Sequence, residues 1–315
     1  SKENLLLGKW CINHENNYSQ NEINHNIIPF HWDDRTKLKK DYDYLEILHA
    51  ELLSSLKNSL NSIHELNHDL RYWQIILDPW LMDYISILFD RWETIESAIK
   101  NFSNLEVDFF QNDNEYFPIE TMDELHGFFN QNEVNQFIYQ DIIKNNFTND
   151  IEIVELSRKL NFKLNFEYPG TNINSKRFAS IVSRSQIYNL VDDFLRIFTK
   201  NNKFIFIDSY FKKYSLIEIN YRLGQIPRLY NNDFRLNSEK ELTISKNSQH
   251  YKREKFEIKF DCKTPFEIFL INYIKRHLPM HIIENYSPII NEVRKIKIFG
   301  DIIITANSHW SDYLK

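Results

Sequence analysis

Glycine is scarce in this sequence, and the few glycines form no nucleotide-binding motif. Only 5 occur among 315 residues, with no Gly-x-Gly-x-x-Gly and no Gly-x-x-x-x-Gly-Lys-Ser/Thr pattern. Both motifs depend on glycine because their backbone must approach a phosphate group closely. The sequence therefore excludes a P-loop NTPase and argues against the usual nicotinamide or flavin enzyme.

Cysteine and paired metal ligands are equally few. The 2 cysteines, Cys11 and Cys262, form neither a disulfide framework nor a Cys-x-x-Cys zinc site, and they fit a reducing cytoplasm. The 11 histidines contain no His-Glu-x-x-His pattern, and His64 and His68 have no evident third ligand. We therefore predict no metal site and no cofactor.

Long apolar runs and clusters of one charge sign are also missing. Runs such as Ile75–Leu77 are far shorter than the ~20 residues that a membrane-spanning helix needs. Residues 1–10 lack the layout of a signal peptide. The net charge is −6 with both signs interspersed, so nucleic acid is not an expected partner. We expect a soluble cytoplasmic protein and leave peripheral contact with the inner face of the membrane open.

What is present predicts an α/β protein. Short apolar runs near Leu5–Leu7, Phe204–Ile207 and Ile302–Ile304 have the composition of buried parallel strands, with helical patterns between them. We predict a mainly parallel sheet with a large helical portion at about 36–160. The polar segment 231–254 indicates a loop or boundary, so we divide the chain into 1–230 and its continuation, 231–315.

Helix starts give the most specific local predictions. Apolar residues recur every three to four positions over 38–63, and Asp33 or Asp34 is placed to cap this helix. Within the next helical block, Asp78-Pro79 is interpreted as the cap and first-turn proline of a new helix. Thr264–Glu267 has the pattern of a capping box with proline at the favoured first position.

One five-residue motif, His31-Trp32-Asp33-Asp34-Arg35, gathers reactive groups at a strand-to-helix junction. In open α/β sheets, ligands bind at the carboxyl ends of strands. His31, Asp33 and Asp34 are therefore candidate general bases, and Arg35 is a candidate holder of an anionic group. The alternative is structural: an aspartate cap, a buried tryptophan and an Arg–Asp surface pair.

Two clusters on the following helical turns combine aromatic and basic residues. Arg71-Tyr72-Trp73 and Phe89-Asp90-Arg91-Trp92 offer indoles, which suit sugar rings, and arginines, which suit phosphates. Arg71, Trp73 and Arg91 are therefore candidate substrate-binding residues. The alternative places the aromatic rings in the core and pairs Asp90 with Arg91.

Small polar residues follow the last predicted strand. Asn307 and Ser308 are candidate substrate-binding residues, because side chains at a strand end before a helix can hold an anion or a hydroxyl group. The alternative is that they only cap that helix. The sequence therefore predicts that His31, Arg71 and Asn307 gather at one rim of a parallel sheet.

The order of these motifs resembles a family of bacterial transferases. The matching segments extend over nearly the whole chain: Gly8-Lys9-Trp10-Cys11, Phe30–Arg35, Arg71-Tyr72-Trp73, Pro79-Trp80-Leu81, Phe89–Trp92 and Thr305–Ser308. Genes of that family lie among those for O-antigen and related surface glycans. The family is similar to two-domain, GT-B-like glycosyltransferases, so the resemblance implies a GT-B-like N-terminal half.

The chain also departs from the family pattern. Lys9 stands where an acidic residue is usual, and Asp78 stands where glycine usually precedes Pro-Trp. Family members continue into a second half with a Gln-His-Gly-Gly segment, which these 315 residues do not contain. We therefore expect this portion to lack most of the donor site and to be inactive alone.

The resemblance implies a glycosyltransferase of bacterial surface polysaccharide biosynthesis. Its partners would be a nucleotide-sugar donor, used as a substrate, and a glycan acceptor. One alternative is a polyol-phosphate or acidic-sugar transferase, which would need more cationic groups. A second is a non-catalytic glycan-binding or assembly module, in which the aromatic and arginine clusters bind without reacting.

Overall fold

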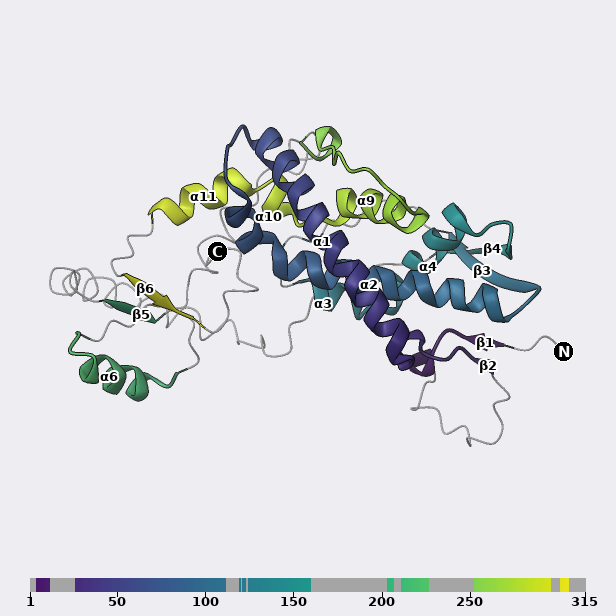
Figure 1. The fold of residues 1–315 in the computed structure, drawn as a ribbon, viewed down its shortest axis with the longest axis horizontal. Helices are drawn as coiled ribbons and strands as arrows, with labels where there is room; N and C mark the ends of the chain where they lie inside the picture. Colours follow the sequence, from purple (N-terminus) through teal and green to yellow (C-terminus); the bar gives the residue numbers. More distant parts are fainter. Residues whose placement is uncertain are drawn as a thin grey trace. The chain divides into compact units, whose positions relative to one another are not determined.

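The computed structural model describes residues 4–11, 26–111, 119, 121–122, 124–159, 203–206, 211–226, 252–295 and 301–305. Contacts divide the chain into two compact units that interleave along the sequence. Unit 1 comprises Ser1–Ile119, Glu124–Leu164 and Lys255–Pro279, and unit 2 comprises Glu120–Asp123, Asn165–Glu254 and Met280–Lys315. The helices and strands of each unit are labelled in Figure 1.

Unit 1 is built on a hairpin of two long helices, α1 (Arg35–His64) and α2 (Leu70–Asn101), which contact each other (Figure 1). The predicted stripe over 38–63 is confirmed, because Leu52, Leu56 and Leu60 on α1 are fully buried. The hairpin therefore follows from two amphipathic patterns that bury their apolar sides together.

The helix α1 starts and ends with side-chain and backbone caps. Asp34 accepts hydrogen bonds from the backbone N–H groups of Thr36 (2.9 Å) and Lys37 (3.3 Å), which confirms that one of the two aspartates is a cap. At the other end, Glu65 adopts a left-handed conformation with φ 56°. Leu66 N–H then donates to Asn61 O at 2.8 Å, which closes a Schellman-type turn.

The prediction of a new helix at Pro79 is wrong, because α2 runs through this proline without a break. Proline removes one backbone hydrogen bond and costs about 3 kcal/mol in a helix interior. Burial of nearby apolar side chains opposes this cost, since Leu77 is fully buried and a buried leucine contributes about 1.5–3 kcal/mol. Asp78 does not start a helix; its Oδ1 lies 3.1 Å from Nε2 of His49.

The predicted helical portion, 36–160, also contains two strands. β3 (Leu105–Gln111) pairs in parallel with β4 (Ile151–Lys159), and the helices α3 (Glu124–Phe129) and α4 (Asn132–Asn146) lie between them in sequence. Parallel strands need such a crossover connection. The helices α1 to α4 occupy most of the helical portion predicted at about 36–160, and the prediction did not include this strand pair.

The helix α9 (Pro265–His277) completes unit 1 and contacts α2. Its start confirms the predicted cap, because Thr264 Oγ1 accepts from Glu267 N–H at 3.2 Å and proline occupies the first turn. The Glu267 carboxylate accepts from the Lys263 N–H and from Tyr44 Oη, the latter at 2.8 Å. The capping carboxylate thus also ties α9 to α1.

The remaining strands are short and parallel. In unit 1, β1 (Leu5–Leu6) pairs with β2 (Asn26–Ile27). The short helix η1 (Lys9–Cys11) follows β1, and the short helix η2 (His31–Asp33) follows β2. In unit 2, β5 (Phe204–Phe206) pairs with β6 (Ile302–Ile304) and precedes α6 (Lys213–Arg222). Parallel pairing in an α/β protein is confirmed. Among the described residues, however, the strands form three separate pairs instead of the expected single sheet.

Unit 2 also contains two consecutive helices, α10 (Met280–Ile283) and α11 (Tyr286–Lys295). They are linked to the preceding chain by a buried ion pair. Arg253 donates through Nε and an Nη nitrogen to the two carboxylate oxygens of Glu284, both at 2.6 Å. Both side chains are at most 4% exposed. In the described part of the chain, no helix is long and apolar enough to span a bilayer.

Candidate functional site

The two motifs around His31 and Asp90 meet in unit 1. Nε2 of His31 lies 3.0 Å from Oδ1 of Asp90, and the two side chains are only 4% and 14% exposed. Because a carboxylate accepts, we assign the N–H of a neutral imidazole to Nε2, which leaves Nδ1 as the acceptor nitrogen. Nδ1 of His31 is buried and has no hydrogen-bond partner among the residues that the structure describes. The pair therefore presents one uncommitted basic nitrogen.

Asp90 is fixed from its other side. Its Oδ2 accepts from Nη1 of Arg91 at 2.7 Å, and Arg91 in turn donates to Oδ1 of Asn135 on α4 at 3.1 and 3.2 Å. Asn135 donates to the carbonyl oxygens of Phe129 (2.6 Å) and Gln131 (2.9 Å). This chain of polar contacts joins α2 to the start of α4, so Asp90 is held rigidly against His31.

A second group of charges lies beside His31. Asp41 Oδ2 accepts from Nε1 of Trp32 at 3.0 Å, and Nζ of Lys37 lies 2.7 Å from Asp41 and 2.6 Å from Glu93. Burial alone would lower the pKa of Lys37, but its hydrogen bonds to Asp41 and Glu93 raise it. Lys37 is therefore charged and balances the carboxylates that face it.

Three residues of this cluster are of the types that bind divalent metals. One ligand atom each from His31, Asp41 and Glu93 lies within 4.8 Å of the other two. A metal ion there would have to displace the ammonium group of Lys37, which already supplies positive charge to both carboxylates. We therefore interpret Asp41 and Glu93 as residues that position Lys37 and Trp32.

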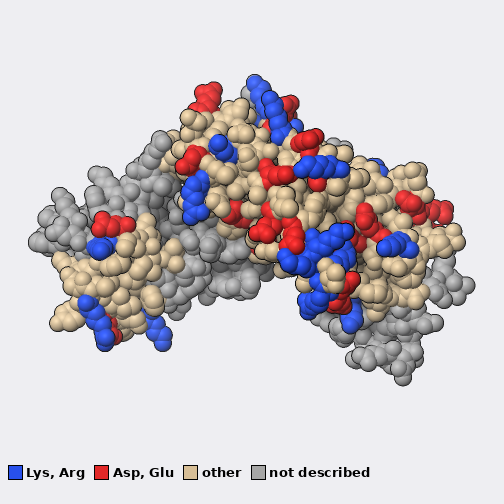
Figure 2. Space-filling model, viewed as in Figure 1, with Lys and Arg blue, Asp and Glu red and all other residues tan. Residues whose placement is uncertain are grey.

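The rest of the His31–Arg35 motif lies at the surface. Asp33 is exposed at the end of η2, and the exposed Asp34 has its Oδ1 engaged in capping α1. Arg35 is exposed and makes no ion pair within the described residues. Basic side chains gather over the first turns of α1 in Figure 2, where the sequence has Arg35, Lys37, Lys39 and Lys40. Of the motif, the structure brings only His31 and Trp32 into the polar cluster.

The Arg71–Trp73 motif lies elsewhere and has a structural role. Trp73 is fully buried and donates through Nε1 to Oδ1 of Asn61 at 2.9 Å. The same Asn61 oxygen accepts from the backbone N–H of His68 at 3.1 Å, so Trp73 and Asn61 together hold the connection between α1 and α2. In this position the indole face of Trp73 is not available to a sugar.

Arg71 does not join His31. It is exposed near the start of α2, where it donates to Gln74 at 3.2 Å, and it precedes Asp90 by roughly 28 Å along the helix axis. His31 and Arg71 therefore do not lie at one rim, contrary to the prediction. The predicted positions of Asn307 and Ser308 fall outside the described residues. Sequence reasoning instead missed Asp90 and Asn135 as partners of the site.

A buried histidine–carboxylate pair beside exposed basic residues suits an enzyme that moves a proton while an anion leaves. The model of the LIC12162 family of transferases matches residues 1–314. The chain therefore belongs to the LIC12162 transferase family. No curated protein and no solved structure matches the sequence.

Proposed function

We propose that this transferase is a glycosyltransferase that moves a sugar from a nucleotide-activated donor to a glycan acceptor in bacterial surface polysaccharide biosynthesis. Family membership supports group transfer, and the sequence resemblance supports the sugar and the O-antigen type of pathway. The observation that carries the proposal is the His31–Asp90 pair, with its uncommitted Nδ1. In this proposal the chain is part of a GT-B-like enzyme and acts in the cytoplasm.

In the proposed step, Nδ1 of His31 removes the proton from an acceptor hydroxyl group. The oxygen then bonds to the anomeric carbon of the donor while the bond from that carbon to the phosphate oxygen breaks, and the nucleotide leaves with the electron pair. Asp90 keeps the imidazole oriented and stabilises the imidazolium that forms. Arg35, exposed one residue after the cap of α1, would offset the charge of the leaving phosphate.

Access to His31 sets a structural requirement. Its side chain is 4% exposed, and the ring of Phe30 lies 5.2 Å from the imidazole, measured between ring centroids. Phe30 itself is 40% exposed, and its ring also lies 5.8 Å from the ring of Trp32, measured between centroids. The proposal therefore requires Phe30 to move aside when the acceptor hydroxyl reaches Nδ1.

The test measures sugar transfer and donor hydrolysis by the full-length protein with a panel of nucleotide sugars. His31→Ala should lower kcat by about 10²–10⁴, and added imidazole should restore part of the loss, because it replaces the missing base. The matched control is His126→Ala, which removes an exposed histidine that lies 3.4 Å from Asp83. Full activity of His31→Ala would remove the base assignment, and binding of glycans without any turnover would favour a binding module.

A further inference from the structure

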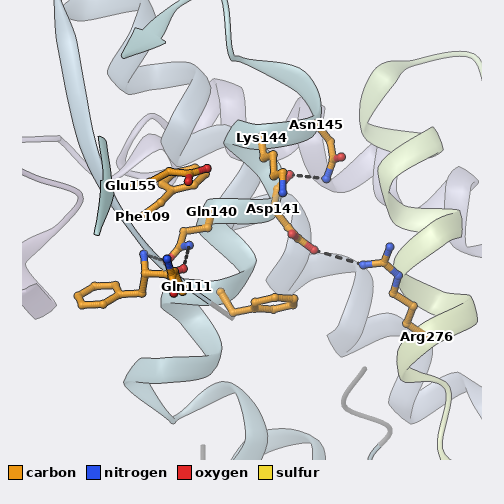
Figure 3. Close-up of a pocket in the computed structure, with 10 residues that line it drawn as sticks. Phe109, Gln111, Gln140, Asp141, Lys144, Asn145, Glu155 and Arg276 are labelled. Carbon is orange, nitrogen blue, oxygen red and sulfur yellow. Dashed lines mark hydrogen bonds and ion pairs between the residues drawn. The ribbon is translucent and has the colours of Figure 1, made fainter. Parts of the chain in front are cut away.

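A polar pocket of about 480 Å³ lies in unit 1, away from the His31–Asp90 pair. It is lined by the carboxyl end of β3, by β4, by α4 and by α9 (Figure 3). Its volume falls in the range of small-molecule sites. The helix α4 connects the pocket to the His31–Asp90 pair. Near the start of α4, Asn135 contacts Arg91, and further along the helix Gln140 and Asp141 line the pocket.

One wall of the pocket is made by the end of β3. Gln140 on α4 accepts from the Phe110 N–H at 3.3 Å and donates to the Phe110 carbonyl at 3.0 Å, as a neighbouring strand would. The pairing with β4 becomes irregular at the next residue, where Gln111 is opposite Lys159. Such irregularities re-aim side chains and are frequent next to binding sites.

One lining residue of the pocket is a partly buried carboxylate, Asp141. Asp141 accepts from Tyr273 Oη at 2.7 Å. It also accepts from Nη1 of Arg276 at 3.3 Å (Figure 3), so two residues of α9 hold α4. Burial raises the pKa of Asp141, and the hydrogen bond from Tyr273 and the charges of Arg276 and Lys144 oppose that rise. The positive charges of Arg276 and Lys144 therefore stabilise the ionised carboxylate of Asp141.

The charges of the lining residues cancel. Lys144 and Arg276 are the cations, and Asp141 and Glu155 are the carboxylates. An anionic ligand would find no surplus of positive charge here. The amide groups of Gln111 and Asn145 add both donors and acceptors, and three phenylalanines add apolar surface. This mixture suits a neutral ring that carries many hydroxyl groups.

We propose that this pocket binds one neutral sugar unit. The inference rests on the proposed function, since it names the substrate class of the transferase, and it favours a neutral sugar over the acidic-sugar or polyol-phosphate alternative. Glu155 accepts hydrogen bonds from sugar hydroxyl groups, and Arg276 and the side-chain amides donate to them. The sugar ring could belong to the acceptor glycan or to the donor.

The experiment is saturation-transfer NMR with the full-length protein and a panel of methyl glycosides, with glucose 1-phosphate as the anionic comparison. Glu155→Gln should weaken glycoside binding about tenfold, because one charged hydrogen bond becomes a neutral one. The matched control is Glu152→Gln, which changes another exposed glutamate of β4 that does not line the pocket. The control should bind as the wild type does.

Competition then assigns the source of the sugar. Displacement of the glycoside by a nucleotide sugar, but not by the nucleotide alone, identifies the donor sugar; displacement by a glycan oligosaccharide identifies the acceptor. The pocket assignment is overturned if no methyl glycoside binds, if only glucose 1-phosphate binds, or if Glu155→Gln binds as tightly as the wild type. Normal sugar transfer by His31→Ala would instead contradict the base assignment and leave glycoside binding intact.

Discussion

Oδ1 of Asp90 lies 3.0 Å from Nε2 of His31, although 59 residues separate the two in sequence. The contact joins η2, at the start of the chain, to the middle of α2. The same carboxylate bonds to Arg91, so its position is determined from two sides. This geometry turns two separate sequence motifs into one candidate acid–base unit.

Replacement of Asp90 tests whether this unit works in catalysis. We expect Asp90→Asn in the full-length protein to lower kcat about 10²-fold with little change in KM, because the imidazole loses the charge that stabilises its protonated form. Asp43→Asn, an exposed change on α1, is the control. Steady-state kinetics together with a thermal melt separate catalysis from stability; equal kcat in both variants would count against the unit.

The cap of α1 gives a stability prediction. Asp34→Ala should lower the free energy of unfolding by about 1 kcal/mol, because two backbone N–H groups lose their acceptor. Asp33→Ala changes the adjacent exposed aspartate, which makes no such bond within the described residues, and should have less than half that effect. Urea unfolding measures both. If Asp33→Ala proves the more damaging, the cap has been assigned to the wrong residue.

The buried pair in unit 2 gives a second stability prediction. Arg253→Met should destabilise the protein by about 3–5 kcal/mol, since it leaves the carboxylate of Glu284 buried without its cation. The double variant Arg253→Met/Glu284→Leu should recover most of that loss. Hydrogen exchange over Met280–Ile283 reports on this unit directly. Equal losses in the single and double variants would show that the ion pair itself is needed.

Two buried tyrosines, Tyr84 and Tyr273, should make the free energy of unfolding fall at alkaline pH. Burial raises the pKa of Tyr84 and of Tyr273 well above their ordinary value. In the unfolded chain tyrosine ionises near pH 10, whereas the folded protein keeps both protons, so stability is complete below about pH 10 and falls as pH rises beyond it.

Above about pH 10, the free energy of unfolding should fall less steeply with pH in Tyr84→Phe than in the wild type. The difference in slope should be up to about 1.4 kcal/mol per pH unit. Urea unfolding at a series of alkaline pH values measures it, with the exposed Tyr42→Phe as the control. A raised pKa of Tyr84 would be contradicted if phenolate absorbance rises before the protein unfolds and Tyr84→Phe removes that rise.

Local signals in the sequence predicted local structure well. Asp34 and Thr264 mark helix starts because a side-chain oxygen next to free N–H groups is sufficient to cap a helix. The apolar runs of β5 and β6 identified parallel strands. The strands β3 and β4 were missed, although Leu105, Val107 and Phe109 alternate with polar residues, because long helical patterns surround them.

Amphipathic spacing and capping residues by themselves determined that this chain forms long helices joined by short parallel strands, because those preferences act over a few residues. Only the tertiary structure decided that Trp73 is core, that α2 continues through Pro79, and that His31 meets Asp90 but not Arg71. These outcomes depend on which helix faces pack together. Which faces pack together depends on contacts between residues that are far apart in sequence. The spacing of residues along one sequence does not give the distances between such residues in space.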